Sequence, residues 1–233
     1  TSVFAIFLAA LFHFSGCTAQ PATQITGSIT PHPDWKPVVY LVQPRHFNEI
    51  AASFSGAVLD SAKIGADGRF VFPNINLADG QALLQLVVQK KGNRYPTQLA
   101  DNDPAYANYF PLVLEKGKTV EVSALAEFFQ KSFLFQNPSE DNASLMKLRD
   151  LRLQSWERQK HQLASNESHD EAALLDREDA LLRFRQPLMV FADTSTLFWP
   201  AMVAVRWVST AGDYERIPEF VFGQCEKWRK KRS

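Results

Sequence analysis

The sequence predicts an α+β fold in which an N-terminal antiparallel β-sandwich is followed by a C-terminal helical segment. Two observations predict this order. Short runs rich in β-branched and aromatic residues, separated by turn residues, fill positions 25–136. Apolar residues at helical spacing fill positions 139–233. We place the boundary where the period of the apolar residues changes.

An apolar run at the N-terminus precedes both parts. Residues 3–14 are apolar except for His13, and this run is too short for a membrane-spanning helix, which needs roughly 20 residues. Its length is that of the apolar region of a secretory signal peptide. Small residues then precede Cys17, and the segment Phe14-Ser15-Gly16-Cys17 resembles the lipobox of bacterial lipoproteins, with phenylalanine where leucine is usual.

This N-terminal pattern predicts where the protein is located. We expect residues 1–16 to be a lipoprotein signal peptide, Cys17 to be acylated after cleavage, and residues 17–24 to form a polar tether. Each buried methylene of an acyl chain contributes about 0.8 kcal/mol, so a multiply acylated cysteine stays on the membrane. The protein would then lie in the cell envelope, facing the periplasm or the exterior. Because the sequence opens at Thr1 without Met or basic residues, we expect it to begin a few residues inside the gene product. The alternative is a buried N-terminal helix with an unmodified cysteine.

Turn residues divide the first part into short strands. Asp67-Gly68 tolerates positive φ and predicts a tight hairpin between the strands on either side. Gly117 predicts a second hairpin between the next two strands. Several short strands with such turns between them indicate an antiparallel sandwich. The expected strands cover residues 25–29, 38–42, 58–64, 70–72, 83–88, 110–114 and 119–122.

Four helical stretches are expected in the second part. The first has capping residues at 139–142 and an uneven apolar stripe, and its polar continuation over 157–169 is expected to be a solvated helix end and loop. The second has leucine pairs seven residues apart and is interrupted by Pro187. The third covers 201–208 with Pro200 in its first turn. The fourth has one apolar face, formed by Val221, Cys225 and Trp228.

Composition excludes several function classes. Lys+Arg and Asp+Glu number 25 each, so the formal net charge is zero and gives no electrostatic attraction to nucleic acid. The chain has two cysteines, Cys17 and Cys225. It therefore cannot form a disulfide framework, a four-cysteine zinc site or a Cys-x-x-Cys redox pair. We predict no catalytic, cofactor-binding or metal-binding residues.

A series of short motifs follows the lipobox in a fixed order. They are Gly27-x-Ile29, Val39-Tyr40-Leu41, Leu59-Asp60-Ser61-Ala62, Asp67-Gly68-Arg69-Phe70-x-Phe72, Phe110-Pro111-Leu112-x-Leu114-Glu115-x-Gly117 and Val120-x-Val122. In this order the sequence resembles the N-terminal accessory region of Bacteroidetes-type lipoproteins related to TlpA-like thiol-disulfide oxidoreductases. The resemblance implies a β-sandwich domain, then a helical segment, then a thioredoxin-like domain with Cys-x-x-Cys. This chain lacks that last motif, because positions 222 and 228 on either side of Cys225 are Phe and Trp.

Several residues suggest chemistry, and each also has a structural interpretation. Cys225 is a candidate reactive thiol, but we expect its side chain to be buried and to act as a small apolar residue of the helix face. His161 and His169 are eight residues apart, which is too wide for a metal pair without a third ligand. Asp101-Asn102-Asp103 resembles the start of a calcium loop without its glycine and distal glutamate, so an exposed loop is expected. Ser195 has no nucleophile motif around it and is expected to cap a helix.

Three functions are compatible with these observations. The first is a non-catalytic, membrane-anchored accessory module of an envelope thiol-disulfide system, truncated before the redox domain. Its partners would be the membrane, through the lipid, and a thioredoxin-like domain or another envelope protein. The second is a glycan- or peptide-binding module that uses aromatic residues. The third is a redox enzyme that uses Cys225 with a partner thiol. The aromatic candidates for the second function are Trp35, Tyr40, Phe47, Tyr95, Tyr106 and Tyr109.

Overall fold

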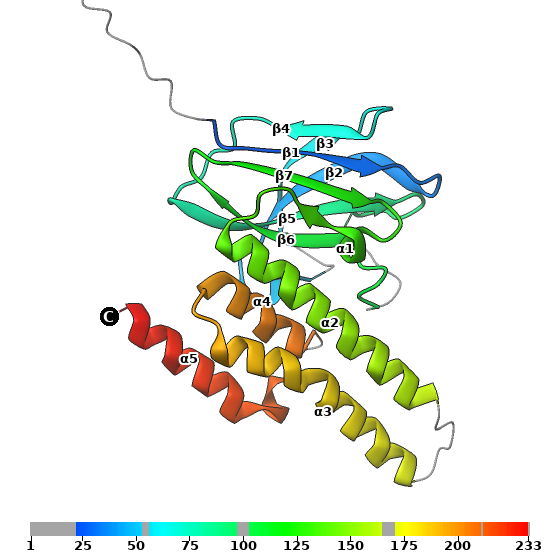
Figure 1. Cartoon of the computed structure of the whole chain (residues 1–233), viewed down its shortest axis with the longest axis vertical. Coiled ribbons are helices and arrows are strands. Elements are labelled where there is room, and N and C mark those ends of the chain that lie inside the picture. Colours follow the sequence, from blue (N-terminus) through cyan, green and yellow to red (C-terminus); the bar gives the residue numbers. More distant parts are fainter. Residues whose placement is uncertain (1–21, 53–55, 97–102, 165–170, 211, 233) are drawn as a thin grey trace, which may run out of the picture.

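The strands of this chain precede its long helices, as Figure 1 shows. The computed structural model describes residues 22–52, 56–96, 103–164, 171–210 and 212–232. Two four-stranded sheets form the first part of these described residues, and the helices pack together beside the sheets. The α+β prediction is confirmed.

The first sheet contains the N-terminal strand in an inner position. Its order is β4 (Arg69–Phe72), β1 (Gln24–Thr30), β7 (Thr119–Leu125) and β8 (Leu134–Phe135). Strand β1 pairs antiparallel with β4 but parallel with β7. The sheet is therefore mixed. Gly27 lies where β1 and β7 approach closely, since a Cβ there would lie 2.4 Å from the carbonyl oxygen of Val122.

The second sheet is antiparallel throughout its described pairs. Its order is β3 (Ala57–Lys63), β2 (Trp35–Gln43), β5 (Gln81–Lys90) and β6 (Tyr109–Glu115). Residues 83–89 of β5 are all buried, so both faces of this strand are covered. The short 3-10 helix η1 (Phe47–Glu49) follows β2. Buried side chains of both sheets belong to one apolar core, as expected for two sheets packed face to face.

Both predicted hairpins were wrong in their pairing, although both turns exist. Gly68 and Gly117 have φ of 81° and 75°, the positive values that the turns require. The strands before and after Gly68 belong to different sheets, and the same holds for Gly117. Each turn therefore carries the chain from one layer of the sandwich to the other. A glycine turn reverses the chain direction but does not decide whether the two strands pair by hydrogen bonds or face each other across the core.

The helices follow a short connection after the first sheet. Helix α1 is a single turn, α2 and α3 are long and lie against each other, and α4 packs against both. Their bounds are α1 (Phe129–Ser132), α2 (Glu140–Ala164), α3 (Glu171–Thr194), α4 (Phe198–Val208), the 3-10 helix η2 (Tyr214–Arg216) and α5 (Pro218–Arg232).

Helix α3 differs from the sequence prediction at Pro187. The proline lies inside the helix and does not interrupt it. Proline removes one helical hydrogen bond, here to the carbonyl of Arg183. The buried residues Phe184 and Leu188 on either side hold the helix in place. The paired leucines of this helix do not form a buried apolar face, because Leu175 is 68% exposed and Leu182 is 56% exposed.

Helix α2 joins the helices to the sheet through side-chain amides. The Asn142 side chain accepts a hydrogen bond from the backbone N–H of Val113 (2.8 Å) and donates one to its carbonyl (2.9 Å). Val113 lies in β6, an edge strand, so this amide satisfies part of an otherwise open edge. Buried residues of sheets and helices form one continuous apolar core.

Candidate functional site

The predicted lipidation site lies outside the described residues. Cys17 falls in residues 1–21, for which no structure is described. Within the described residues, no helix is long and apolar enough to cross a membrane.

The burial expected for Cys225 was wrong. Its side chain is exposed. The buried face of α5 is formed instead by Phe220, Gln224 and Trp228, which follow i, i+4, i+8 spacing. Cys225 is one position beyond Gln224 and is therefore turned about 100° away from that face. The structure thus leaves the thiol accessible, without a second cysteine among the described residues.

The other candidate polar residues do not form a reactive group. His161 is exposed, and His169 lies outside the described residues. No cluster of three or more metal-ligating side chains occurs in the part of the chain that the structure describes. Asp103 accepts a hydrogen bond from the backbone N–H of Ala105 at 2.8 Å and lies 3.5 Å from Lys160. These are contacts of a turn residue; Asp101 and Asn102 are not described.

Ser195 occupies the turn before α4. Its hydroxyl accepts a hydrogen bond from the backbone N–H of Leu197 at 3.2 Å. This is a local turn contact at the start of the helix, and a side chain so engaged organises the connection between α3 and α4. The predicted capping role was wrong, because Leu197 is the N-cap residue of α4 and no side-chain hydrogen bond caps this helix.

The six aromatic candidates are divided between the core and the surface. Trp35 and Tyr109 are buried, and Tyr40 is half-buried. Phe47 packs on Tyr214 with ring centroids 5.9 Å apart. The two other exposed rings have their own neighbours, which are Phe128 for Tyr106 and Arg94 for Tyr95.

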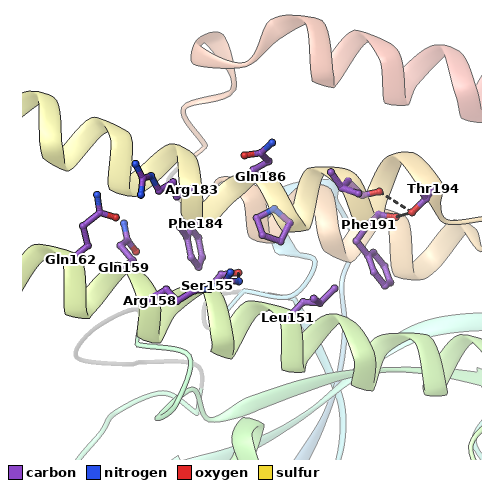
Figure 2. A pocket seen from close by; sticks show the side chains of 12 residues that line it. Leu151, Ser155, Arg158, Gln159, Gln162, Arg183, Phe184, Gln186, Phe191 and Thr194 are labelled. Carbon is purple, nitrogen blue, oxygen red and sulfur yellow. Dashed lines mark hydrogen bonds between the residues drawn. The ribbon is translucent and has the colours of Figure 1, made fainter.

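A groove lies between α2 and α3. It has a volume of about 910 Å³, which is within the range of ligand-binding sites. Figure 2 shows Leu151 and Ser155 of α2 and Phe184 and Phe191 of α3 in the space between the two helices, whereas Gln186 points away from α2. Its lining combines apolar side chains with amide, hydroxyl and guanidinium groups. The apolar members are Leu151, Phe184, Pro187, Val190 and Phe191, and the polar ones are Ser155, Arg158, Gln159, Gln162, Arg183, Gln186 and Thr194.

The charged groups that line this groove are both cations. Arg158 donates to the carbonyl of Gln154 at 3.3 Å and to the Ser155 hydroxyl at 3.2 Å; both acceptors are neutral. Arg183 pairs with Asp179 at 2.8 Å, but this pair is 69% and 48% exposed and is therefore weak. Among the described contacts, Arg158 is thus the lining cation that no carboxylate pairs, while Arg183 has a weak, exposed pair.

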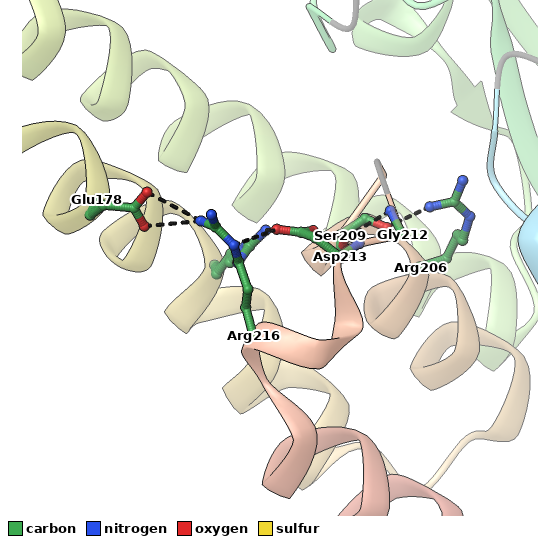
Figure 3. A network of polar contacts seen from close by, with 7 residues as sticks. Glu178, Arg206, Ser209, Gly212, Asp213 and Arg216 are labelled. Atoms are coloured by element: carbon green, nitrogen blue, oxygen red, sulfur yellow. Dashed lines mark hydrogen bonds and ion pairs between the residues drawn. The ribbon is translucent and has the colours of Figure 1, made fainter. Parts of the chain in front are cut away.

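A polar network links α3, one of the two helices of the groove, to the segment between α4 and α5. Figure 3 shows it running from Glu178 through Arg216 and Asp213 to Ser209. The buried Arg185 of α3 also binds Asp213 at 2.6 Å. Hydrogen bonds from Arg185 and then from Ser209 lower the pKa of Asp213. Asp213 therefore stays ionised and connects α3 to the segment between α4 and α5.

A second buried polar cluster connects the sheet to the helices. The hydroxyl of Tyr109 and the indole N–H of Trp207 both donate to the carbonyl of Ala51, at 2.6 and 3.0 Å. The Arg152 guanidinium lies 4.7 Å above the Trp207 ring and donates to Gln130 at 2.7 Å. Burial lowers the pKa of Arg152. Ala51, Tyr109, Arg152 and Trp207 are all buried, so the cluster ties the sheet to the helices from within the core.

Comparisons of the chain with known protein families, with characterised proteins and with solved structures found no match. The site is therefore interpreted from its geometry alone. Sequence reasoning missed the α2–α3 groove. The sequence signal for it was the spacing of Phe184 and Phe191, which are seven residues apart and therefore lie on one side of a helix. These two residues line a groove only when α2 packs against α3.

Proposed function

We propose that this protein is a non-catalytic, lipid-anchored accessory module of the cell envelope that docks a thioredoxin-like protein or domain. The observation that carries the docking role is the α2–α3 groove, a concave surface that combines apolar side chains with two arginines on two packed helices. The lipobox-like segment ending at Cys17 supports the anchor. The motif order that resembles the TlpA-like group supports the choice of partner.

The site chemistry supports binding over catalysis. The groove is lined by amide, hydroxyl, guanidinium and apolar groups, and these lack the nucleophile–base pair that covalent catalysis requires. Cys225 lies on α5 and is not among the groove residues. We therefore expect the purified chain to give no insulin-reduction turnover above a no-protein control, and measurable turnover would contradict a non-catalytic role.

Fractionation tests the anchor. The Cys17→Ala variant should move from the membrane fraction to the soluble fraction, because acylation is lost. Cys225→Ala is the matched control, since it removes the other cysteine and should stay with the membrane. Retention of Cys17→Ala in the membrane fraction would contradict the lipid anchor.

Site-specific crosslinking tests the partner. A photoreactive residue at Gln159 in the groove should give a crosslinked species in intact cells, and mass spectrometry should identify in it a thioredoxin-like domain with Cys-x-x-Cys. A photoreactive residue at Glu226, which is exposed on α5, is the control and should not give that species. A crosslinked partner without a thiol-disulfide domain, or identical products from both positions, would overturn the proposed partner.

A second candidate function is glycan binding. One smaller hollow, of about 440 Å³, contains Phe47, Trp199 and Asp79, and aromatic faces beside polar groups suit a sugar ring. Phe47 is the only one of the six predicted aromatic residues among its lining residues as described. Saturable quenching of tryptophan fluorescence by soluble oligosaccharides, lost in Trp199→Ala, would favour this function. Unchanged fluorescence would count against it.

A further inference from the structure

The groove has the length of a short helix. Its lining runs from Leu151 to Gln162 on α2 and from Arg183 to Thr194 on α3. At 1.5 Å per residue each side covers about three helical turns, or roughly 16 Å. An amphipathic helix that contributes side chains at i, i+3, i+4 and i+7 spans a groove of this size.

The two ends of the groove differ in chemistry. Figure 2 shows Gln159, Gln162 and Arg183 toward one end and Leu151 and Phe191 toward the other. The apolar end includes Val190, which is 52% exposed. Covering this side chain with an apolar group of an occupant would be favourable, because it removes apolar surface from water. An occupant must therefore combine apolar side chains with groups that bind cations and amides.

Charge selects among possible occupants. Arg158 and Arg183 are the ionised residues that line the groove, and Arg158 has neutral partners in the contacts described above. Carboxylates on an occupant can form bidentate contacts with guanidinium groups. The exposed Asp179 competes for Arg183 only weakly. Lysines or arginines on an occupant would instead be repelled.

From these features we infer that the groove binds an acidic amphipathic α-helix of a partner protein. The inference rests on the proposed docking function and adds the chemistry of the docked segment. The helix places an apolar stripe on Phe184, Val190 and Phe191 and glutamates or aspartates beside Arg158 and Arg183. A fatty acid fits less well, because an open groove leaves one side of an acyl chain in water.

Peptide binding to the purified chain tests the inference. The probe is a fluorescein-labelled synthetic helix with leucines at i, i+3, i+4 and i+7 and glutamates beside them, measured by fluorescence anisotropy. A second peptide carries lysine in place of each glutamate, and a third has the acidic composition in an order that breaks the stripe. We expect the first to bind at least about tenfold more tightly than either of the others. Equal affinities for the three peptides would overturn the inference, and this comparison needs no variant.

Charge reversal of the protein localises the binding. The double variant Arg158→Glu, Arg183→Glu should lose at least about tenfold in affinity for the acidic peptide and gain affinity for the basic one. Arg229→Glu on α5 is the control, since it makes the same kind of change at an exposed position outside the groove. Both proteins are compared by circular dichroism. Unchanged peptide preference in a folded double variant would overturn the inference.

Two further outcomes separate this inference from the proposed function. Saturable binding of dodecanoate without binding of any peptide would identify a lipid site and overturn the helical occupant. A thioredoxin-like crosslink at Gln159 without acidic-peptide binding would also overturn the acidic helix, while leaving the docking function intact. Acidic-peptide binding without that crosslink supports the helix and counts against the proposed partner.

Discussion

The carbonyl of Ala51 receives two buried hydrogen bonds, and this redundancy makes a quantitative prediction. Ala51 is fully buried and has a φ of 46°, in the left-handed region that costs a non-glycine residue roughly 1–2 kcal/mol. Tyr109 and Trp207 hold it there. Tyr109→Phe leaves the Trp207 donor in place and should cost only about 1 kcal/mol of the free energy of unfolding.

Trp207 contributes more to the free energy of unfolding than its hydrogen bond alone. Trp207→Phe loses one donor (about 1 kcal/mol), leaves a small cavity (about 1 kcal/mol) and weakens the contact with the Arg152 guanidinium (about 0.5–1 kcal/mol). We therefore expect a loss of about 3 kcal/mol. In the double variant no donor reaches the buried carbonyl, which costs about 1–2 kcal/mol beyond the single losses. The hydrogen bond from the Trp207 indole to the Tyr109 hydroxyl (3.0 Å) is broken in both single variants and is counted twice in their sum. The cost of the double variant should therefore exceed that sum by about 1 kcal/mol.

Urea unfolding of the four proteins measures these terms. The free energy of unfolding comes from linear extrapolation, with the slopes compared to check that the unfolding transitions are alike. Additive single costs would refute the view that the two donors substitute for each other. A cost for Trp207→Phe no larger than that for Tyr109→Phe would refute the contribution of the guanidinium and the indole volume.

Three further predictions follow from single positions. Gly27→Ala should lower stability by about 1–3 kcal/mol, read as a lower melting temperature in calorimetry, because the added Cβ would lie 2.4 Å from the Val122 carbonyl oxygen; an unchanged melting temperature would contradict the close β1–β7 approach. Hydrogen bonds from Arg45, the largest cause, lower the pKa of Glu49 from 4.5 to about 2, so its stabilisation is present above pH 4.5 and is lost as the pH falls toward 2. Urea midpoints between pH 7 and pH 3 should therefore fall less steeply in Glu49→Gln than in the parent, and parallel curves would argue against this pair. Gln85 is fully buried and its amide lacks a partner among the described residues, so Gln85→Met should raise the urea midpoint by an amount equivalent to about 1 kcal/mol; a lower midpoint would indicate that the amide is satisfied.

Local sequence patterns predicted where strands and helices lie better than they predicted which strands pair with one another. Asp67-Gly68 and Gly117 place turns correctly because positive φ is a property of single residues. Which strands pair depends on residues far away, such as Val122 opposite Gly27 across a parallel ladder. No pattern within either strand contains this information.

The helical part shows the same limit. Pro187 reads as a helix end, yet buried neighbours keep α3 continuous. Three apolar residues of α5 at helical spacing, including Cys225, suggested one buried face, yet a polar residue, Gln224, takes the buried position. Tertiary packing decides both cases. The groove was not predictable, because its two walls come from different helices and meet only in the folded chain.

The inner position of β1 in the first sheet means that one of its two partner strands is synthesised much later than β1 itself. Gln24 of β1 pairs with Thr119 of β7, which is 95 positions later in the chain. Strand β1 is therefore synthesised long before β7, and its hydrogen-bonding edge stays open until most of the sandwich has been made. Such an edge readily pairs with another chain, so a nascent chain that stops before residue 119 lacks the native strand that covers it. Long-range pairs also form slowly, which lengthens the time for which this edge is exposed.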